Sequence, residues 1–206
     1  MSLEHQGADR MSGAEFRAFQ ATRPDHERWE LVGGIAVPVV HQTIMHNRLA
    51  SNLDRLLNER LERYAPSLLA TQRLGIDFDA RDCKPEPDVA VVDADYGAGQ
   101  RFVEKAYLLA EVASEADEIV VPGTDRRWID VKREMYRGHP HCEAVVVVAQ
   151  DRMCVELDLR KEAGWKSCVL EGPDAELVVT SIGARFFLSD LYEGTPLRPR
   201  RGEQFL

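Results

Sequence analysis

The 206-residue sequence lacks long hydrophobic runs and closely spaced cysteine pairs. Its apolar runs are only a few residues long, whereas a transmembrane helix needs about 20, so we expect no membrane segment. The beginning of the chain, MSLEHQGADRMSGAEF, has neither a basic start nor an apolar stretch, so we expect no signal peptide. The cysteines, Cys83, Cys142, Cys154 and Cys168, form no CxxC motif, which is typical of reduced thiols. We therefore expect a cytoplasmic protein without membrane contact.

The sequence also lacks an excess of basic residues, since its formal net charge is −9. Nucleic-acid binding needs a basic surface for the phosphates, so this balance weakens that class of function, although a local basic patch can lie on an acidic protein. The content of 44% hydrophobic and 30% charged residues is typical of a globular protein. The length fits one domain over residues 1–206, with a core at about 11–160 and a strand-rich extension at about 161–197.

The spacing of apolar residues predicts helices that alternate with short strands. Residues 11–20 predict a short helix, and the Gly-Gly pair at 33–34 separates two strands of a hairpin. Apolar residues at steps of three and four predict the longest helix over 41–64. Residues 68–79 predict one strand, and 125–138 predict a helix between further apolar strands. The predicted fold class is therefore α/β, with a mixed β-sheet core flanked by helices and extra strands towards both termini.

Three carboxylates interrupt the predicted apolar strands: Glu30, Asp88 and Glu111. An ionised carboxylate that is buried without a partner costs several kcal/mol. A hard divalent cation such as Mg²⁺ or Mn²⁺ removes this cost because it binds oxygen ligands, and the backbone carbonyl of Val112 can add another oxygen. The alternative is that each acid caps a turn or pairs with an arginine at the edge of the sheet.

Several segments of the chain occur in a characteristic order over roughly residues 11–160. They are WELVGG, HQTIMHNRLASNLDRLL, PEPDVAVV, LLAEVAS, and KREMY before a strand that contains VVVV. This order resembles the Uma-two (Uma2) family, the restriction-endonuclease-like proteins of the PD-(D/E)xK nuclease superfamily. The resemblance implies a restriction-endonuclease-like core in which Asp88 and Glu111 bind the metal ion. It further implies Glu30 as an additional acid and Lys132 as the basic residue of the catalytic site.

The chain departs from the superfamily pattern at one important position. A lysine usually lies two residues after the second acid, but Ala113 occupies that position here. The resemblance implies that the following helix supplies the lysine instead, which fits Lys132. His41 and Gln42 resemble the His-Gln pair of the family and are candidates for the cleft wall, although Gln42 is equally suited to cap the helix. Tyr136 is a further cleft candidate.

The basic residues of the 125–138 helix suggest a phosphate-facing surface, but an ordinary solvated face is an equal alternative. They are Arg126, Arg127, Lys132, Arg133 and Arg137. The segment HPHC at 139–142 contains zinc-ligand residue types, but it lacks a second ligand cluster, and we favour a turn before a strand.

Two functions remain open from the sequence. The first is a divalent-metal-dependent nuclease that hydrolyses phosphodiester bonds, most plausibly in DNA, with Mg²⁺ or Mn²⁺ as cofactor. The second is a non-catalytic protein that keeps the nuclease fold and serves in binding or assembly. The retained acids and Lys132 favour the first, whereas the acidic balance and Ala113 favour the second. We also expect a homodimer, because the alternating apolar faces of the C-terminal strands need cover.

Overall fold

A computed structural model describes residues 10–24, 27, 29–38, 42–78, 84–114, 117–121 and 125–199. Its centre is a six-stranded sheet with the strand order β10-β9-β8-β7-β5-β3. The pair β7 and β8 is parallel and the other neighbours are antiparallel. The strands are β3 (Leu68–Gln72), β5 (Val89–Asp93), β7 (Leu108–Val112), β8 (Ala144–Val148), β9 (Cys154–Lys161) and β10 (Gly164–Glu171).

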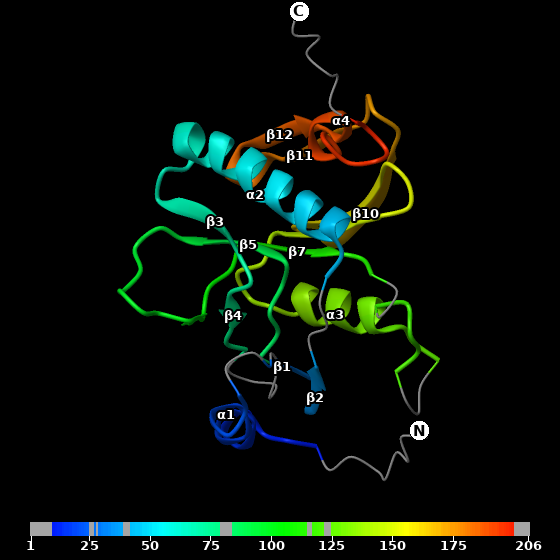
Figure 1. Ribbon diagram of the computed structural model, residues 1–206. Coiled ribbons are helices and arrows are strands. Elements are labelled where there is room, and N and C mark those ends of the chain that lie inside the picture. Colours follow the sequence, from blue (N-terminus) through cyan, green and yellow to red (C-terminus); the bar gives the residue numbers. More distant parts are fainter. Residues whose placement is uncertain are drawn as a thin grey trace, which may run out of the picture.

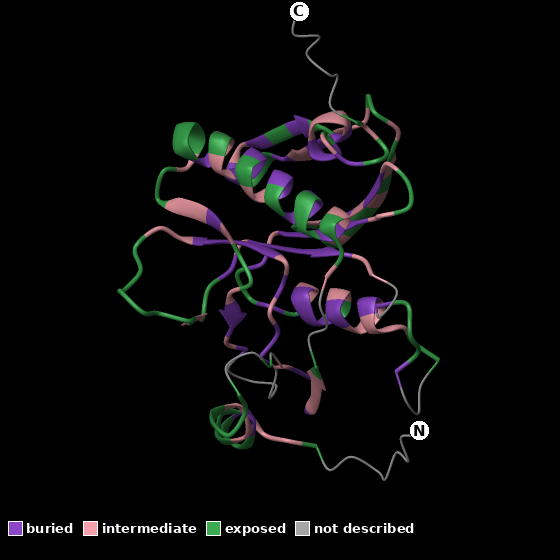
Figure 2. Ribbon diagram, in the orientation of Figure 1, coloured by how far each residue is buried: buried purple, intermediate pink, exposed green. Residues whose placement is uncertain are grey.

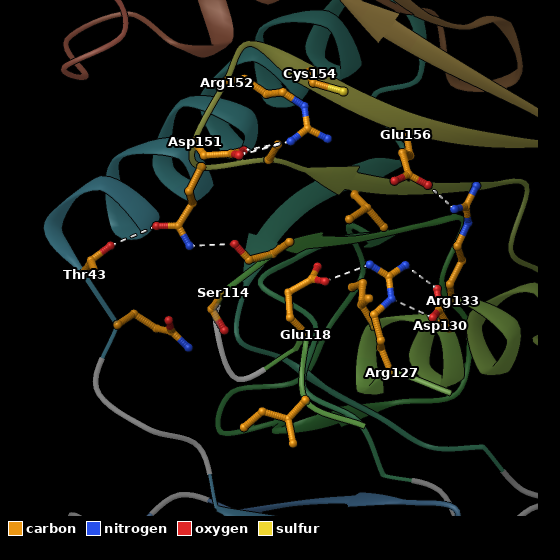
Figure 3. A pocket seen from close by; sticks show the side chains of 17 residues that line it. Thr43, Ser114, Glu118, Arg127, Asp130, Arg133, Asp151, Arg152, Cys154 and Glu156 are labelled. Atoms are coloured by element: carbon orange, nitrogen blue, oxygen red, sulfur yellow. Dashed lines mark hydrogen bonds and ion pairs between the residues drawn. The ribbon is translucent and has the colours of Figure 1, made fainter. Parts of the chain in front are cut away.

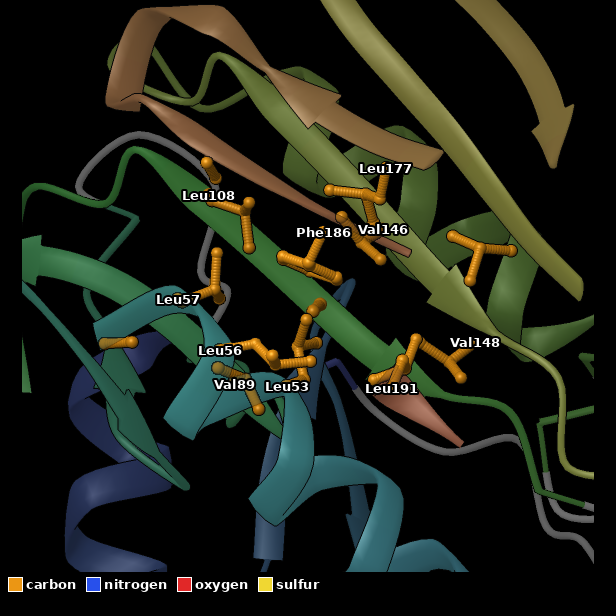
Figure 4. Close-up of a cluster of buried hydrophobic side chains, with 14 of the residues drawn as sticks. Leu53, Leu56, Leu57, Val89, Leu108, Val146, Val148, Leu177, Phe186 and Leu191 are labelled. Carbon is orange, nitrogen blue, oxygen red and sulfur yellow. The ribbon is translucent and has the colours of Figure 1, made fainter. Parts of the chain in front are cut away.

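One face of this sheet is covered by apolar side chains of the long helix α2 (Ile44–Tyr64) and of the C-terminal elements (Figures 1 and 4). Leucines at helical spacing, including Leu53 and Leu57, are fully buried against the sheet. The C-terminal elements are β11 (Glu176–Val179), the 3-10 turn Thr180–Ile182, β12 (Ala184–Phe187) and α4 (Leu188–Leu191). Leu177 and Phe186 from β11 and β12 are buried in the same cluster. The apolar faces of these two strands are therefore covered within the chain.

The opposite face carries helix α3 (Trp128–Arg137) and several small elements from the first half of the chain (Figure 1). These elements are α1 (Gly13–Ala21), β1 (Trp29–Val32), β2 (Ile35–Pro38), β4 (Gly75–Ile76) and β6 (Phe102–Val103). The inner sheet strands β5, β7 and β8 and the inner side of α3 are buried (Figure 2). Because side chains alternate between the faces of a strand, Leu109 and Val145 lie on this side, with Glu111 between Ala110 and Val112.

Most predicted elements are present, and the mixed sheet flanked by helices is confirmed. Ser12 caps α1, and its hydroxyl and the Glu15 carboxylate form a capping box. Gly33 and Gly34 have φ angles of 57° and 82°, which a tight hairpin turn requires and which other residues rarely adopt. The β1–β2 hairpin is therefore confirmed.

Two strand predictions are corrected by the structure. The segment 68–79 is not one strand, because Arg73 adopts a left-handed φ of 55° and breaks it. The first part, β3, joins the central sheet, whereas β4 pairs in parallel with β6 outside it. The predicted strand-rich extension at about 161–197 is also not all strand, since β12 ends at Phe187 and the helix α4 begins at Leu188.

Two absences concern only the part of the chain that the structure describes. None of its helices is long and apolar enough to span a membrane. Its His, Cys, Asp and Glu side chains form no group of three or more with the geometry to hold a metal ion. The HPHC segment lies in the turn between α3 and β8, where the His139 ring is hydrogen-bonded to the Glu104 carbonyl at 3.1 Å.

Candidate active site

Two of the predicted metal-binding acids lie side by side at the ends of neighbouring strands. Val89 of β5 pairs with Ala110 of β7, so continuation of this register places Asp88 across from Glu111 and on the same face. Directly opposed residues of an antiparallel pair typically have Cβ atoms about 4.5–5.5 Å apart. Asp88 Oδ2 accepts a hydrogen bond from the Val112 backbone N–H at 2.8 Å, and His46 Nε2 lies 3.1 Å from the same oxygen.

Lys132 projects from α3 into a group of three carboxylates, which we call the Lys132 cluster: Lys132, Glu30, Glu111 and Asp117. Its Nζ atom lies 2.9 Å from Glu30 Oε1, 3.4 Å from Glu111 Oε2 and 3.7 Å from Asp117 Oδ1. All four side chains are largely buried. One ammonium group is therefore shared by three acids, and only its contact with Glu30 has the length of a normal hydrogen bond.

Burial controls the protonation of this cluster. Burial raises the pKa of Glu111 well above its usual range; the charge of Lys132 opposes this shift, and the charges of Asp88, Asp117 and Glu30 add to it. Burial lowers the pKa of Lys132, but the surrounding carboxylates outweigh this effect and raise it well above the ordinary value. The ammonium group therefore stays charged. Burial and the nearby carboxylates also raise the pKa of Tyr136, so its hydroxyl keeps the proton that it donates to Glu111.

Asp117 and His46 belong to the site but were not identified from the sequence. The Ser114 backbone N–H and hydroxyl both donate to Asp117 Oδ2, at 2.9 and 2.6 Å, which turns the loop after β7 back towards Lys132. No pattern distinguishes Asp117 from the other acids of this polar loop. His46 could have been found, because it shares the apolar face of α2 with Leu49 and Leu53 at helical spacing.

The acids surround a small cavity of about 70 Å³, and its wall includes Asp88, Glu111, Lys132, His46 and Gln42. Gln42 and Ser114 also line an adjoining groove of about 1150 Å³ (Figure 3). The small cavity therefore lies beside a surface groove that is large enough for an extended ligand.

The remaining cleft candidates occupy different places. Gln42 lines the cavity, and the residue that caps α2 is Thr43, whose hydroxyl accepts from the His46 N–H at 3.0 Å. Tyr136 is fully buried behind Glu111 and does not line the cavity. Val112 is buried in β7, where its N–H binds Asp88. His41 lies outside the described residues.

The donor chemistry of the site fits a hard divalent ion. Asp88 and Glu111 line the same small cavity, and the Val112 backbone N–H binds Asp88 beside it. Mg²⁺ is commonly bound through one or two carboxylates, with water and substrate phosphate as its other ligands.

The basic residues of the α3 region do not form one free cationic surface. Arg127 pairs with Asp130 and Glu118, both at 2.8 Å (Figure 3). Arg133 binds Asp158 through two nitrogens, at 2.5 and 2.6 Å, and also pairs with Glu156; we call these three residues the Arg133 cluster. Most of these cations are therefore already neutralised by acids of the same chain.

Comparison with known proteins identifies the family. A model of the Uma2 family, described as "Putative restriction endonuclease", matches residues 14–188. The chain belongs to the Uma2 family. The crystal structure of a "putative nuclease belonging to DUF820" from Anabaena variabilis ATCC 29413 is similar, with a TM-score of 0.66 and 16% sequence identity. The match covers 88% of this chain and 97% of that one. No curated protein shows a significant match.

These comparisons confirm the restriction-endonuclease-like fold that the order of motifs implied. At 16% identity, the solved structure supports the fold alone. The description of the family indicates a restriction-endonuclease-like nuclease, and nucleases of this kind usually use divalent metal ions.

Proposed function

We propose that this Uma2 protein is a divalent-metal-dependent nuclease that hydrolyses phosphodiester bonds in DNA. The observation that carries the proposal is the position of Lys132, whose ammonium group lies 3.4 Å from Glu111 and 2.9 Å from Glu30. Asp88 lies across from Glu111 in the adjoining strand. The two carboxylates would bind a metal ion, and the buried ammonium group of Lys132 would supply a fixed positive charge beside it.

Asp88, Glu111 and the backbone carbonyl of Val112 would hold Mg²⁺ or Mn²⁺. When bound, the ion would supply Lewis-acid chemistry, polarising the phosphate and lowering the pKa of a water molecule.

The protein groups orient the other components. Lys132 is a compact donor that can bind a phosphoryl oxygen and stabilise the charge that develops there. Glu30 and Asp117 hold its ammonium group near Glu111. Tyr136 keeps its proton and fixes Oε1 of Glu111, whereas Oε2 has only a long contact of 3.4 Å with Lys132 and can also bind a ligand.

A plasmid-nicking assay tests the proposal. The purified protein should convert supercoiled plasmid to relaxed and linear forms with Mg²⁺ or Mn²⁺, but not with a chelator. Asp88→Asn and Lys132→Met should lose this activity, each by at least about 100-fold, since each removes a group that acts on the reacting phosphate. Arg185→Gln, a change of an exposed residue on β12, is the matched control and should cleave normally. Equal nicking by all four proteins would reveal a contaminant and remove the support for the proposal.

A non-catalytic binding function is the second candidate. It is favoured by Ala113 in the usual lysine position and by the pairing of Lys132 with three carboxylates. DNA binding by the wild-type protein without any metal-dependent cleavage would select this function.

We also propose that the protein is a homodimer. The edge strand β10 leaves backbone groups available for pairing, and its Val169 is 58% exposed. Sedimentation that shows only monomers at micromolar concentration would refute the dimer.

A further inference from the structure

A tryptophan lies at the end of α3, away from the Lys132 cluster. Trp165 comes from the edge strand β10 and is half-buried against the α3 side of the sheet. The guanidinium carbons of Arg160 and Arg137 lie 5.0 and 5.6 Å from the centre of its indole ring. This arrangement places an aromatic surface beside two cations.

The two arginines differ in how firmly they are held. Arg160 donates to the backbone carbonyls of Cys142 and His139, each at 2.6 Å, and to that of Arg137 at 3.3 Å. These bonds make Arg160 part of the turn between α3 and β8. Among the described residues, the side chain of Arg137 forms no direct ion pair; it contacts the Trp165 ring, and its charge acts on Asp158 without a direct contact. Arg137 is therefore the cation that a ligand can engage at small cost.

This aromatic region adjoins the groove that reaches the candidate active site. Gln42 and Ser114 line both the small cavity and the large groove. Asp130 and Arg133 lie at the other end of the large groove (Figure 3). Both also line a further hollow, whose wall includes Arg137 and Trp165. The surface is thus continuous from the Lys132 cluster, along the outer side of α3, to Trp165.

Charge along this path favours a single nucleic-acid strand over a duplex. In the large groove, Arg127 and Arg133 are already paired with acids. A protein gains affinity for a duplex mainly by neutralising many phosphates on its two backbones, and the groove offers too few available cations for this. A single strand binds with fewer phosphate contacts, because its unpaired bases can stack on aromatic side chains.

We propose that Trp165 and Arg137 form an accessory subsite for single-stranded nucleic acid, with an unpaired base stacked on the indole and a phosphate bound by Arg137. The base takes the place of the Arg137 guanidinium over the ring, and the guanidinium turns to the phosphate. The subsite deepens the proposed function and rests on it, because the same strand continues along α3 to the cavity beside Lys132. With this subsite, the protein should prefer substrates with unpaired strands or overhangs.

Binding measured without cleavage tests the subsite. Fluorescence anisotropy would follow a labelled short oligothymidylate, and a duplex of equal length, in buffer with a chelator. Trp165→Leu should weaken single-strand binding roughly 5- to 100-fold, and Trp165→Phe should restore most of it. Tyr96→Leu changes an exposed aromatic residue on the β5–β6 loop and should leave binding unchanged.

Arg137→Gln provides an independent test if Trp165→Leu fails to fold. It should reduce the slope of log affinity against log salt concentration by about 0.7, the loss of one phosphate contact on a single strand. Arg185→Gln, with the same change of charge on β12, should leave the slope unaltered. Unchanged binding by Trp165→Leu, an equal loss in Tyr96→Leu, or tighter binding of the duplex would overturn the subsite. Plasmid cleavage with Mg²⁺ separately decides the proposed function, so the two failures are distinguishable.

Discussion

Lys132 and Arg133 are neighbours on α3, yet they meet buried acids in two different ways. Arg133 forms a two-nitrogen contact with Asp158, whose side chain is completely buried, and also pairs with Glu156. Lys132 shares one ammonium group among three carboxylates at 2.9 to 3.7 Å. Each acid of the Arg133 cluster therefore has a short contact with the guanidinium group, whereas in the Lys132 cluster only Glu30 has a short contact with the ammonium group.

The pKa values of the two buried acids shift in opposite directions. Burial acts to raise the pKa of Asp158, but hydrogen bonds from Arg133 and Ser167 outweigh it, so the pKa is lowered. For Glu111, burial outweighs the attraction of Lys132 and the pKa is raised. A pair that lowers the pKa of its acid stabilises the fold, while an acid with a raised pKa retains affinity for a further cation. The difference assigns a structural role to the Arg133 cluster and leaves the Lys132 cluster for chemistry.

The largest expected effect comes from breaking the structural pair. Arg133→Met leaves the buried Asp158 without its cation and should reduce the free energy of unfolding by about 3–5 kcal/mol at neutral pH. The folded-state pKa of Asp158 is lowered, so its stabilising contribution exists above the unfolded pKa of about 3.9 and disappears as the pH falls through the folded pKa. The loss in the variant should therefore shrink in acid. Urea denaturation from neutral pH to about pH 3, below the unfolded pKa of an Asp, would measure it.

An exposed ion pair provides the control for this loss. Arg55→Met also removes one positive charge, but Arg55 pairs with Glu59 on the exposed side of α2 at 2.6 Å. An exposed pair four residues apart on a helix contributes only about 0.3–0.5 kcal/mol. Equal losses in the Arg55 and Arg133 variants, or a loss that does not change with pH, would contradict the structural role.

The rise in melting temperature on metal binding should depend on the acids beside Lys132 and not on the Arg133 cluster. An ion that binds only the folded state stabilises it by about 2.7 kcal/mol at a hundredfold excess over Kd, so Mg²⁺ or Mn²⁺ should raise the melting temperature of the wild-type protein. Asp88→Asn should lose most of this rise, because the substitution removes one ligand charge. Asp158→Asn should melt at a lower temperature but keep the full rise. Equal metal-induced shifts in the wild type and in Asp88→Asn would rule out Asp88 as a ligand.

The sequence was sufficient to predict the layers of the fold, because they follow from local periodicity. Leucines at helical spacing identified α2, and short apolar runs identified β5, β7 and β8. The break between β3 and β4 was missed, since the left-handed backbone at Arg73 has no signal in the residue type. An Arg usually avoids that conformation, and here it precedes the pairing of β4 with β6 outside the central sheet.

The candidate site was predictable where an acid interrupts an apolar strand and not elsewhere. Glu111 and Asp88 stood out against the apolar residues around them, and the structure places them side by side. Residue type alone could not distinguish Lys132 from Arg133, because both are basic residues on one helix, and only the family resemblance selected Lys132. Their separate roles depend on which strand each one faces, β7 or β9. Asp117 lies in a polar loop, and only the folded loop brings it to Lys132.

The smallest effect, and the sharpest test of the comparison, is the pH dependence that Glu111 confers on the metal-free protein. The folded-state pKa of Glu111 is raised above its unfolded value of about 4.3. Its contribution to stability is therefore fully present below that value and is lost as the pH rises through the folded pKa. Glu111→Gln cannot ionise, and its amide oxygen can still accept from Tyr136. The wild type should lose stability relative to this variant by up to about 1.4 kcal/mol per pH unit over that interval.

Asp158→Asn should give the opposite slope in more acidic solution, where the free energy of unfolding of the wild type increases relative to that of the variant as the pH rises. Urea denaturation in the presence of a chelator would measure both differences, and parallel curves for the two variants would show that the two clusters do not differ in kind.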